Sequence, residues 1–295
     1  MLYIVRSNVT EPFIESNYEK HEELNATAFH LNFVVYKSIN EHAYDLIEAN
    51  SIIEDEDGHQ YRVKQINENQ FSKQITANHI FYDLVGTFKE GSFTGQRSFN
   101  EYANFVLNGT GWTFANLNIS YLRSFNSFGA NNVIQLLQRL IDGFDCEIQI
   151  LPNRVLRFAT RIGGDYDTQY RYKSNIKELT QSIDTTNVRT RIKAYGADGI
   201  SVTYTSPLAN NELFGLIDAE PVKDESINNS SALLEFARRS LMDYPDTNID
   251  VSVLDVNAYI GDTVYVIHEG LNIDITTRVL SKTTRREFED SIIQL

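Results

Sequence analysis

Alternating apolar and polar positions indicate β-strands toward both ends of the chain. In residues 27–37, Phe29, Leu31, Phe33 and Val35 alternate with other side chains, a period of two that is typical of a half-buried strand. The runs 51–53 and 60–64 flank the acidic sequence EDEDG and predict a hairpin, with Gly58 supplying the positive φ of its turn. By the same reasoning, further strands are expected within 2–5, 71–84, 146–151, 155–159, 170–205 and 250–295.

Three segments have apolar residues at helical spacing instead. The sequence from Ser98 to Glu101 has the form of a capping box, and the helix it begins is expected to end at Gly109 and Gly111. A second helix is predicted for 131–144, ending near Gly143. A third is predicted for 230–242, with Pro245 preventing its continuation and with these side chains facing inward: Leu233, Leu234, Ala237 and Leu241.

The order of these elements predicts an α+β chain that is mostly β and has several domains. We expect a small β domain in 1–94 and an α+β domain in 95–168. Strands with a loop extension follow in 169–226, since 205–226 is polar and carries two prolines. A helix and the C-terminal strands make up 227–295.

Composition restricts the classes of function. Of the 295 residues, 42% are apolar and 22% charged, as in globular proteins with a sizeable core. Asp and Glu outnumber Lys and Arg by 40 to 26, and the resulting net charge of −14 disfavours a protein that grips nucleic acid or an anionic membrane. No run approaches 18 apolar residues, so no transmembrane helix is expected. The first residues are too polar for a signal peptide, and we expect synthesis and folding in a reducing cytoplasm.

Motifs for catalysis or cofactor binding do not emerge from the sequence. It contains no His-Glu-x-x-His, no Gly-x-Ser-x-Gly and no P-loop, and its six histidines are not paired at metal-ligand spacing. We therefore expect no metal and no cofactor. The acidic run 54–57 lacks the spacing of a calcium loop and is interpreted as a solvated turn. Asp165 and Asp167 favour a polar strand edge over a catalytic pair, and Cys146 is expected to be a small buried apolar residue.

The stretch SIDTTNVRTRIKAYGADG (182–199) combines an acidic residue, Asp184, with a basic row. Strand alternation puts Arg189, Arg191 and Lys193 on one face and leaves Thr190, Ile192 and Ala194 to pack inward on the other. Two interpretations remain open. The basic row forms a site for an acidic partner, including acidic residues of the same or a neighbouring chain, or it is a solvated sheet face.

Three segments, in this order along the chain, resemble the prophage tail endopeptidase family, the N-terminal hub part of siphophage tail-associated lysins. ANHIFYDL (77–84) is similar to the family's Ala-x-His-Ile-x-Tyr-Asp-Leu and contributes His79, Tyr82 and Asp83. The signature region, 170–199, contributes Lys173, Asn175, Ile176, Asp184, Thr190, Arg191, Tyr195 and Gly196. The late strands, Gly-Asp-x-Val followed by Arg-Val, contribute Gly261, Asp262 and Arg278.

The resemblance implies a structural protein similar to the baseplate hub of contractile-tailed phages. That fold has two β-barrel-like domains with smaller α+β domains and forms a homotrimer, whose quasi-sixfold ring ends the tail tube and gates the passage of DNA. We then expect a distal tail protein and other tail-tip proteins as partners, DNA that passes without specific binding, and a location at the virion tail tip after synthesis in the bacterial host cytoplasm. The matching residues above are expected to be scaffold.

The family name also implies peptidoglycan cleavage, which lies in C-terminal extensions of longer members. With no such extension and no catalytic constellation visible up to Leu295, we expect no enzymatic activity. Two alternatives are a peptidoglycan endopeptidase and a receptor- or glycan-binding tail module, the latter suggested by the many Tyr and Asn residues.

Overall fold

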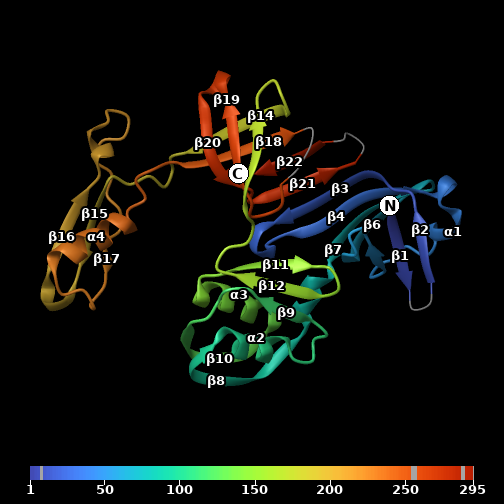
Figure 1. Ribbon diagram of the computed structural model, residues 1–295, viewed down its shortest axis with the longest axis horizontal. Helices are drawn as coiled ribbons and strands as arrows, with labels where there is room; N and C mark the ends of the chain where they lie inside the picture. Colours follow the sequence, from blue (N-terminus) through green and yellow to red (C-terminus); the bar gives the residue numbers. More distant parts are fainter. Residues whose placement is uncertain (7–8, 254–257, 287–289, 295) are drawn as a thin grey trace. The chain divides into compact units, whose positions relative to one another are not determined.

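The chain forms two compact units, 1–179 with 250–295 and 180–249, which we call the larger and the smaller unit (Figure 1). The structure is a computed structural model, and it describes all residues except 7–8, 254–257, 287–289 and 295. Among the described residues, no helix is long and apolar enough to cross a membrane.

An eleven-stranded sheet brings together strands from both ends of the sequence. In spatial order its strands are β14 (Ile176–Asp184), β18 (Asp246–Val253), β22 (Asp290–Gln294), β21 (Ser281–Arg285), β3 (Ser16–Glu23), β4 (Phe29–Tyr36), β7 (Ser72–His79), β6 (Gln60–Glu68), β5 (Ile52–Glu54), β1 (Leu2–Arg6) and β2 (Val9–Phe13). The C-terminal strand β21 pairs antiparallel with β3, so the last residues complete the N-terminal sheet. The chain passes into the smaller unit through β14 and leaves it through β18.

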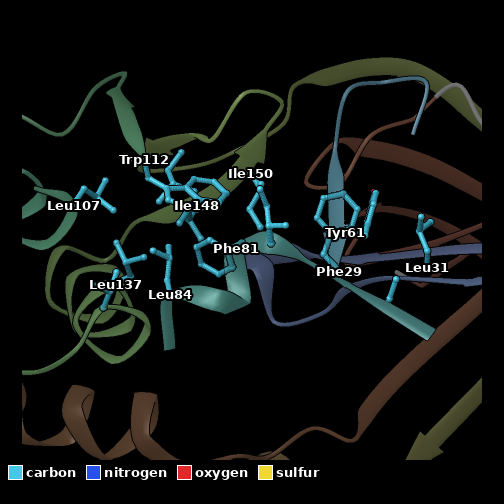
Figure 2. Packing of buried hydrophobic residues seen from close by; sticks show 14 of the residues in the cluster. Phe29, Leu31, Tyr61, Phe81, Leu84, Leu107, Trp112, Leu137, Ile148 and Ile150 are labelled. Atoms are coloured by element: carbon cyan, nitrogen blue, oxygen red, sulfur yellow. The ribbon is translucent and has the colours of Figure 1, made fainter. Parts of the chain in front are cut away.

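Two helices and two small sheets form the α+β part of the larger unit. Its elements are β8 (Phe88–Ser98), α2 (Phe99–Leu107), β9 (Thr113–Asn116), β10 (Leu122–Asn132), α3 (Val133–Phe144), β11 (Glu147–Leu151) and β12 (Val155–Ala159). α2 begins with the predicted capping box, in which the side chains of Ser98 and Glu101 each accept from the other's backbone N–H. The apolar faces of both helices join the core of the large sheet, and Figure 2 shows Phe29, Leu31 and Tyr61 in one buried cluster with Leu107 and Leu137.

A third small sheet of the larger unit contains β13 (Asp165–Arg171), β19 (Thr263–His268) and β20 (Ile273–Arg278). β13 is an edge strand that runs parallel to β19. The remaining helices of the larger unit are short: η1 (Leu24–Ala26), η2 (Lys37–Ile39), α1 (Glu41–Tyr44), η3 (Ile80–Gly86) and η6 (Glu269–Leu271).

The smaller unit has a core of its own. Its sheet has the order β16 (Ser201–Thr205), β15 (Arg191–Tyr195) and β17 (Val222–Lys223), accompanied by η4 (Ala197–Gly199), η5 (Pro207–Asn210) and α4 (Ser230–Ser240). Ile192 and Ala194 of the sheet pack with three residues of the helical segment: Leu233, Ala237 and Leu241. With Thr190 also buried, the predicted inward face of the strand is confirmed.

The predicted fold class is confirmed, since strands predominate and the chain forms several sheets and two units. The sheets are open, because in the strand orders of the described residues the outermost strands, such as β14 and β2, are not neighbours. In the described part of the chain, none of the sheets therefore closes into a barrel. The four-part division at 94, 168 and 226 stays a prediction.

The predicted end of one strand is wrong. The strand expected over 71–84 ends at His79, where the His79 ring caps the 3-10 helix η3 and Phe81 and Leu84 turn into the core. The predicted end of the second helix is confirmed, since α3 ends at Phe144, beside Gly143, with Asp145 in the left-handed conformation. Gly143 is also a packing position, since a Cβ there would lie 2.2 Å from Cζ of Phe125.

The third helix also differs from its prediction. α4 ends at Ser240, before Pro245 can act, because Leu241 adopts an extended backbone that still buries its side chain. Leu234, expected to face inward, is 40% exposed.

Candidate functional site

His79, Tyr82 and Asp83 lie where β7 passes into η3. The backbone N–H of Phe81 donates to Nδ1 of His79 at 3.1 Å, and the Tyr82 hydroxyl donates to the carbonyl of Ala26 at 2.9 Å. Asp83 accepts from Nε of Arg62 at 2.8 Å. The three residues thus fix a turn of the chain against the large sheet.

Gly261, Asp262 and Arg278 form a junction between the small sheets of the larger unit. Gly261 has φ of +89°, and a Cβ there would lie 2.5 Å from the carbonyl oxygen of Ile162. The buried Asp262 carboxylate accepts from the backbone N–H groups of Gly164 and Tyr259 at 2.9 and 2.8 Å. These contacts hold the turn before β13 against the start of β19.

Arg278 links this junction to β11. Its two terminal nitrogens donate to the Glu147 carboxylate at 2.8 and 2.9 Å, and one of them also donates to the carbonyl of Ile162 at 2.8 Å. Burial acts to raise the pKa of Glu147, but the hydrogen bonds from Arg278 and from the backbone of Ile162 hold it below its ordinary value. The bidentate geometry fits a fixed structural contact.

Lys173, Asn175 and Asp184 lie at turns. Lys173 has φ of +63°, and Asn175 closes that turn by accepting from the N–H of Arg171 at 2.7 Å and donating to the carbonyl of Gln169 at 2.8 Å. The next residue, Ile176, is buried. The exposed Asp184 accepts from the N–H of Thr186 at 2.8 Å.

The remaining four signature residues lie in the smaller unit. Buried Thr190 donates to the carbonyl of Gly215 at 2.8 Å and accepts from the N–H of Ile217 at 2.7 Å. The φ of Gly196 is −113°, which other residues also adopt. Glycine is needed there for space, because a Cβ would lie 2.5 Å from the carbonyl oxygen of Ile227. The ring of Tyr195 lies beneath Nζ of Lys193, 5.0 Å from it.

One residue of the basic row, Arg191, has an acidic partner in the structure. Its guanidinium donates to both carboxylate oxygens of Asp218 at 2.5 and 2.8 Å, so its acidic partner belongs to the same chain. Because both side chains are exposed, water weakens the pair. The structure does not bring Asp184 to this pair among the described contacts, and the signature residues gather in several separate places. Their scaffold role stays a prediction.

A buried polar cluster in the larger unit was missed by the sequence reasoning. Asp55 is 2% exposed, accepts from the Tyr61 hydroxyl at 3.0 Å, and lies 3.3 Å from Nζ of Lys20. The interpretation of the acidic run 54–57 as a solvated turn is therefore wrong for Asp55, which is buried. Burial acts to lower the pKa of Lys20, but Glu22 and Asp55 raise it above its ordinary value. The alternation of β3, which places Lys20 on the same face as Tyr18, was the only signal in the sequence.

Two histidines lie beside this cluster. Nδ1 of His59 is 3.2 Å from Nε2 of His79, and the His79 ring stacks on Phe29 with centroids 4.7 Å apart. Burial lowers the pKa of both rings, and for His79 well below its ordinary value. The 20 residues that separate the two rings in sequence hid the pair from a search for metal-ligand spacing.

A pocket of about 360 Å³ opens next to the cluster. β3 and β21 contribute polar side chains to it, including Lys20 and Lys282, while β11 contributes Ile148 and Ile150. Figure 2 shows Phe29, Ile148 and Ile150 among the buried residues of this region.

The chemistry available in the described residues is limited. They contain no group of three or more His, Cys, Asp or Glu side chains that could hold a metal ion. Cys146 is buried as predicted, and burial raises the pKa of its thiol to about 12, so it stays protonated at neutral pH. Asp165 and Asp167 are exposed on the edge strand β13, where Asp165 pairs with Arg161, as expected of a polar strand edge.

Three family models match the chain in succession. They are the prophage endopeptidase tail N-terminal domain at 4–79, the prophage endopeptidase tail domain at 88–158, and the prophage endopeptidase tail at 165–293. The chain belongs to the prophage endopeptidase tail family.

Solved structures agree with this assignment. The prophage tail protein gp18 from Listeria monocytogenes is 25% identical, with a TM-score of 0.71 over 100% of this chain and 93% of that one. The 43 kDa tail protein of prophage MuSo2 from Shewanella oneidensis shares the fold at 11% identity, with a TM-score of 0.73 over 99% and 96% of the two chains. A search of curated proteins found no match. This family member is a prophage tail protein with similarity to baseplate proteins.

Proposed function

We propose that this prophage tail protein is a structural component of the tail tip, where three copies form a ring that ends the tail tube and gates the passage of DNA. The observation that carries the proposal is the similarity to Listeria gp18 along the entire chain. The Escherichia coli protein c3393, a component of the type VI secretion system described as similar to the phage T4 tail proteins gp27 and gp5, shares the fold at 9% identity with a TM-score of 0.54 over 100% of this chain and 76% of that one. This likeness supports a hub-like position.

Charge is consistent with a channel for DNA. Three chains of net charge −14 carry −42 together, and an acidic wall repels phosphates, so DNA passes without binding. Under this proposal the chain is made in the host cytoplasm, becomes part of the virion tail tip, and contacts a distal tail protein and other tail-tip proteins.

We also propose that the chain itself is not the endopeptidase of the family's name. In the larger unit, Tyr82 and Asp262 hold turns and strand ends. In the smaller unit, Thr190 and Arg191 hold a loop beside β15. Contacts of this kind support a scaffold role.

The particle mass tests the proposal. One chain has a mass of 33.8 kDa, and light scattering on the purified protein should give three times this value, with the same stoichiometry in isolated tails. A single-chain mass in solution and in tails would overturn the trimer. Zymography on host cell walls tests the second part, because clearing by the purified chain would restore the endopeptidase alternative.

A further inference from the structure

The pocket beside Lys20 has a polar face and an apolar lining. Tyr18, Lys20 and Glu22 of β3 lie in one row. Lys282, Thr284 and Arg286 form a second row along and just beyond β21, because alternate residues of paired strands share a face and Lys282 lies opposite Glu22. The apolar lining comes from Ala26, Phe29, Ile148, Ile150, Ile162 and Ile260. A ligand here would meet charge on one side and hydrocarbon on the other.

Most charges around the pocket already have partners. Lys20 lies 3.0 Å from Asp57 and 3.7 Å from Glu22, in addition to its contact with Asp55. Arg286 pairs with Glu56 at 2.8 Å and also with Glu15. Glu23 accepts from Thr27 at 2.6 Å and lies 3.0 Å from His21. Each of the four carboxylates of the lining therefore has at least one charged or hydrogen-bonding partner.

Lys282 differs from the other two cations of the pocket. Within the described part of the chain it has no ion pair, and its Nζ donates to the carbonyl of Ala258 at 3.2 Å. An ammonium group has three donors, so this contact leaves capacity for a ligand. Burial lowers the pKa of Lys282, and the nearby Lys20 lowers it further, although Glu22, Asp57 and Asp262 act to raise it.

We propose that this pocket binds a small organic anion, with a carboxylate on Nζ of Lys282 and an apolar or aromatic body against Phe29 and the isoleucines. The volume of about 360 Å³ lies at the lower end of the roughly 300–1,000 Å³ typical of ligand pockets. The exposed ring of Tyr259 lies 5.6 Å from Nζ of Lys282 and would flank the ligand. The site does not depend on the proposed trimer.

Binding of such an anion is coupled to protonation. A carboxylate on Nζ favours the charged amine, so the bound state holds its proton more firmly than the free state does. The affinity should therefore weaken as the pH rises through the lowered pKa of Lys282, and binding should take up protons from the buffer near that pKa.

Calorimetric titration with matched probes tests the proposal. On the full chain, 3-phenylpropionate should bind at least about tenfold more tightly than the uncharged 3-phenylpropionamide, which corresponds to about 1.4 kcal/mol. Lys282→Met should abolish this preference, and Lys282→Arg should retain it. Lys223→Met is the matched control, because Lys223 is an exposed lysine of the smaller unit. Circular dichroism verifies that each variant is folded.

Equal affinity of the acid and the amide for the wild-type chain would overturn the proposal, and so would a preference that survives in folded Lys282→Met. A further arm compares N-acetylphenylalanine with 3-phenylpropionate to distinguish the end of a polypeptide from a free carboxylate. Tighter binding of the former, lost in Lys282→Met, supports a polypeptide end as the source. Tighter binding of the latter, lost in the same variant, supports a free small molecule.

Discussion

The contacts of His59 and His79 determine which nitrogen of each neutral ring carries the proton. Nδ1 of His79 accepts from the Phe81 N–H, so the neutral ring carries its proton on Nε2 and donates it to Nδ1 of His59 at 3.2 Å. A second proton on either of these acceptor nitrogens would break a hydrogen bond inside the core. The nearby Lys20 also disfavours protonation of both rings, although the carboxylates Asp55, Glu22 and Asp57 favour it at His59. Both rings are therefore held neutral.

This arrangement predicts a loss of stability in mild acid. The unfolded chain takes up protons on these histidines below a pH of about 6.5, whereas the folded chain does so only at lower pH. The contribution of the two neutral histidines to the free energy of unfolding is thus fully present above this pH. It falls as the pH drops toward 5, by up to about 1.4 kcal/mol per pH unit for each histidine. Urea unfolding measured between pH 7.5 and 5 should show this slope.

His59→Gln should flatten the slope by removing one of the two rings. His42→Gln is the control, because His42 is exposed at the surface, and it should leave the slope unchanged. A slope that is the same in His59→Gln as in the wild type would exclude the histidine pair as its cause.

Which single residues could be predicted depended on how far away their partners lie in the sequence. The inward face of Thr190, Ile192 and Ala194 follows from strand alternation alone and is confirmed. The buried role of Asp55 does not, because its partner Lys20 is 35 residues away, on β3. An acidic turn with and without such a partner looks identical in the sequence.

At the scale of elements, starts encoded in neighbouring residues were predicted and ends set by tertiary contacts were not. The capping box of α2 lies within four residues and is present as predicted. The end of β7 depends on the His79 ring, which is held in turn by Phe29 of β4 and by His59. Helix propensity and alternation carry no information on such contacts.

The capping box makes a prediction for the element it begins. Ser98→Ala removes the acceptor for the Glu101 N–H and should lower the free energy of unfolding by about 1 kcal/mol. Ser124→Ala, at an exposed position of the neighbouring β10, should change it by less than about 0.5 kcal/mol. Chemical denaturation of both variants provides the measurement, and equal effects would mean that the box contributes nothing specific to α2.

At the scale of the molecule, the strands could be predicted but their partners could not. Arg285 at the end of β21 pairs with Glu19 of β3 across 266 residues of sequence. Alternation in 250–295 indicated strands, yet it carries no information on which sheet they join. The candidate pocket depends on this pairing, because its two polar rows come from β3 and β21. It was therefore outside the reach of sequence reasoning.

The separate cores of the two units predict separate responses to mutation. In the smaller unit, Ile192, Ala194, Leu233, Ala237 and Leu241 form a small buried apolar cluster, which is distinct from the large cluster of the larger unit. Leu233→Ala removes a side chain that is 0% exposed and should destabilise the smaller unit by about 2–5 kcal/mol. Leu234→Ala, one residue along the same helix, changes a side chain that is 40% exposed and should have little effect.

Hydrogen exchange read by mass spectrometry locates the effect, because peptides from each unit are followed separately. In Leu233→Ala, exchange should accelerate in peptides from 180–249 and stay unchanged in the large sheet, at one protein concentration throughout so that assembly does not alter the comparison. Faster exchange throughout the chain would show instead that the two units unfold as one. Equal acceleration in Leu234→Ala would show that burial of Leu233 is not what stabilises the smaller unit.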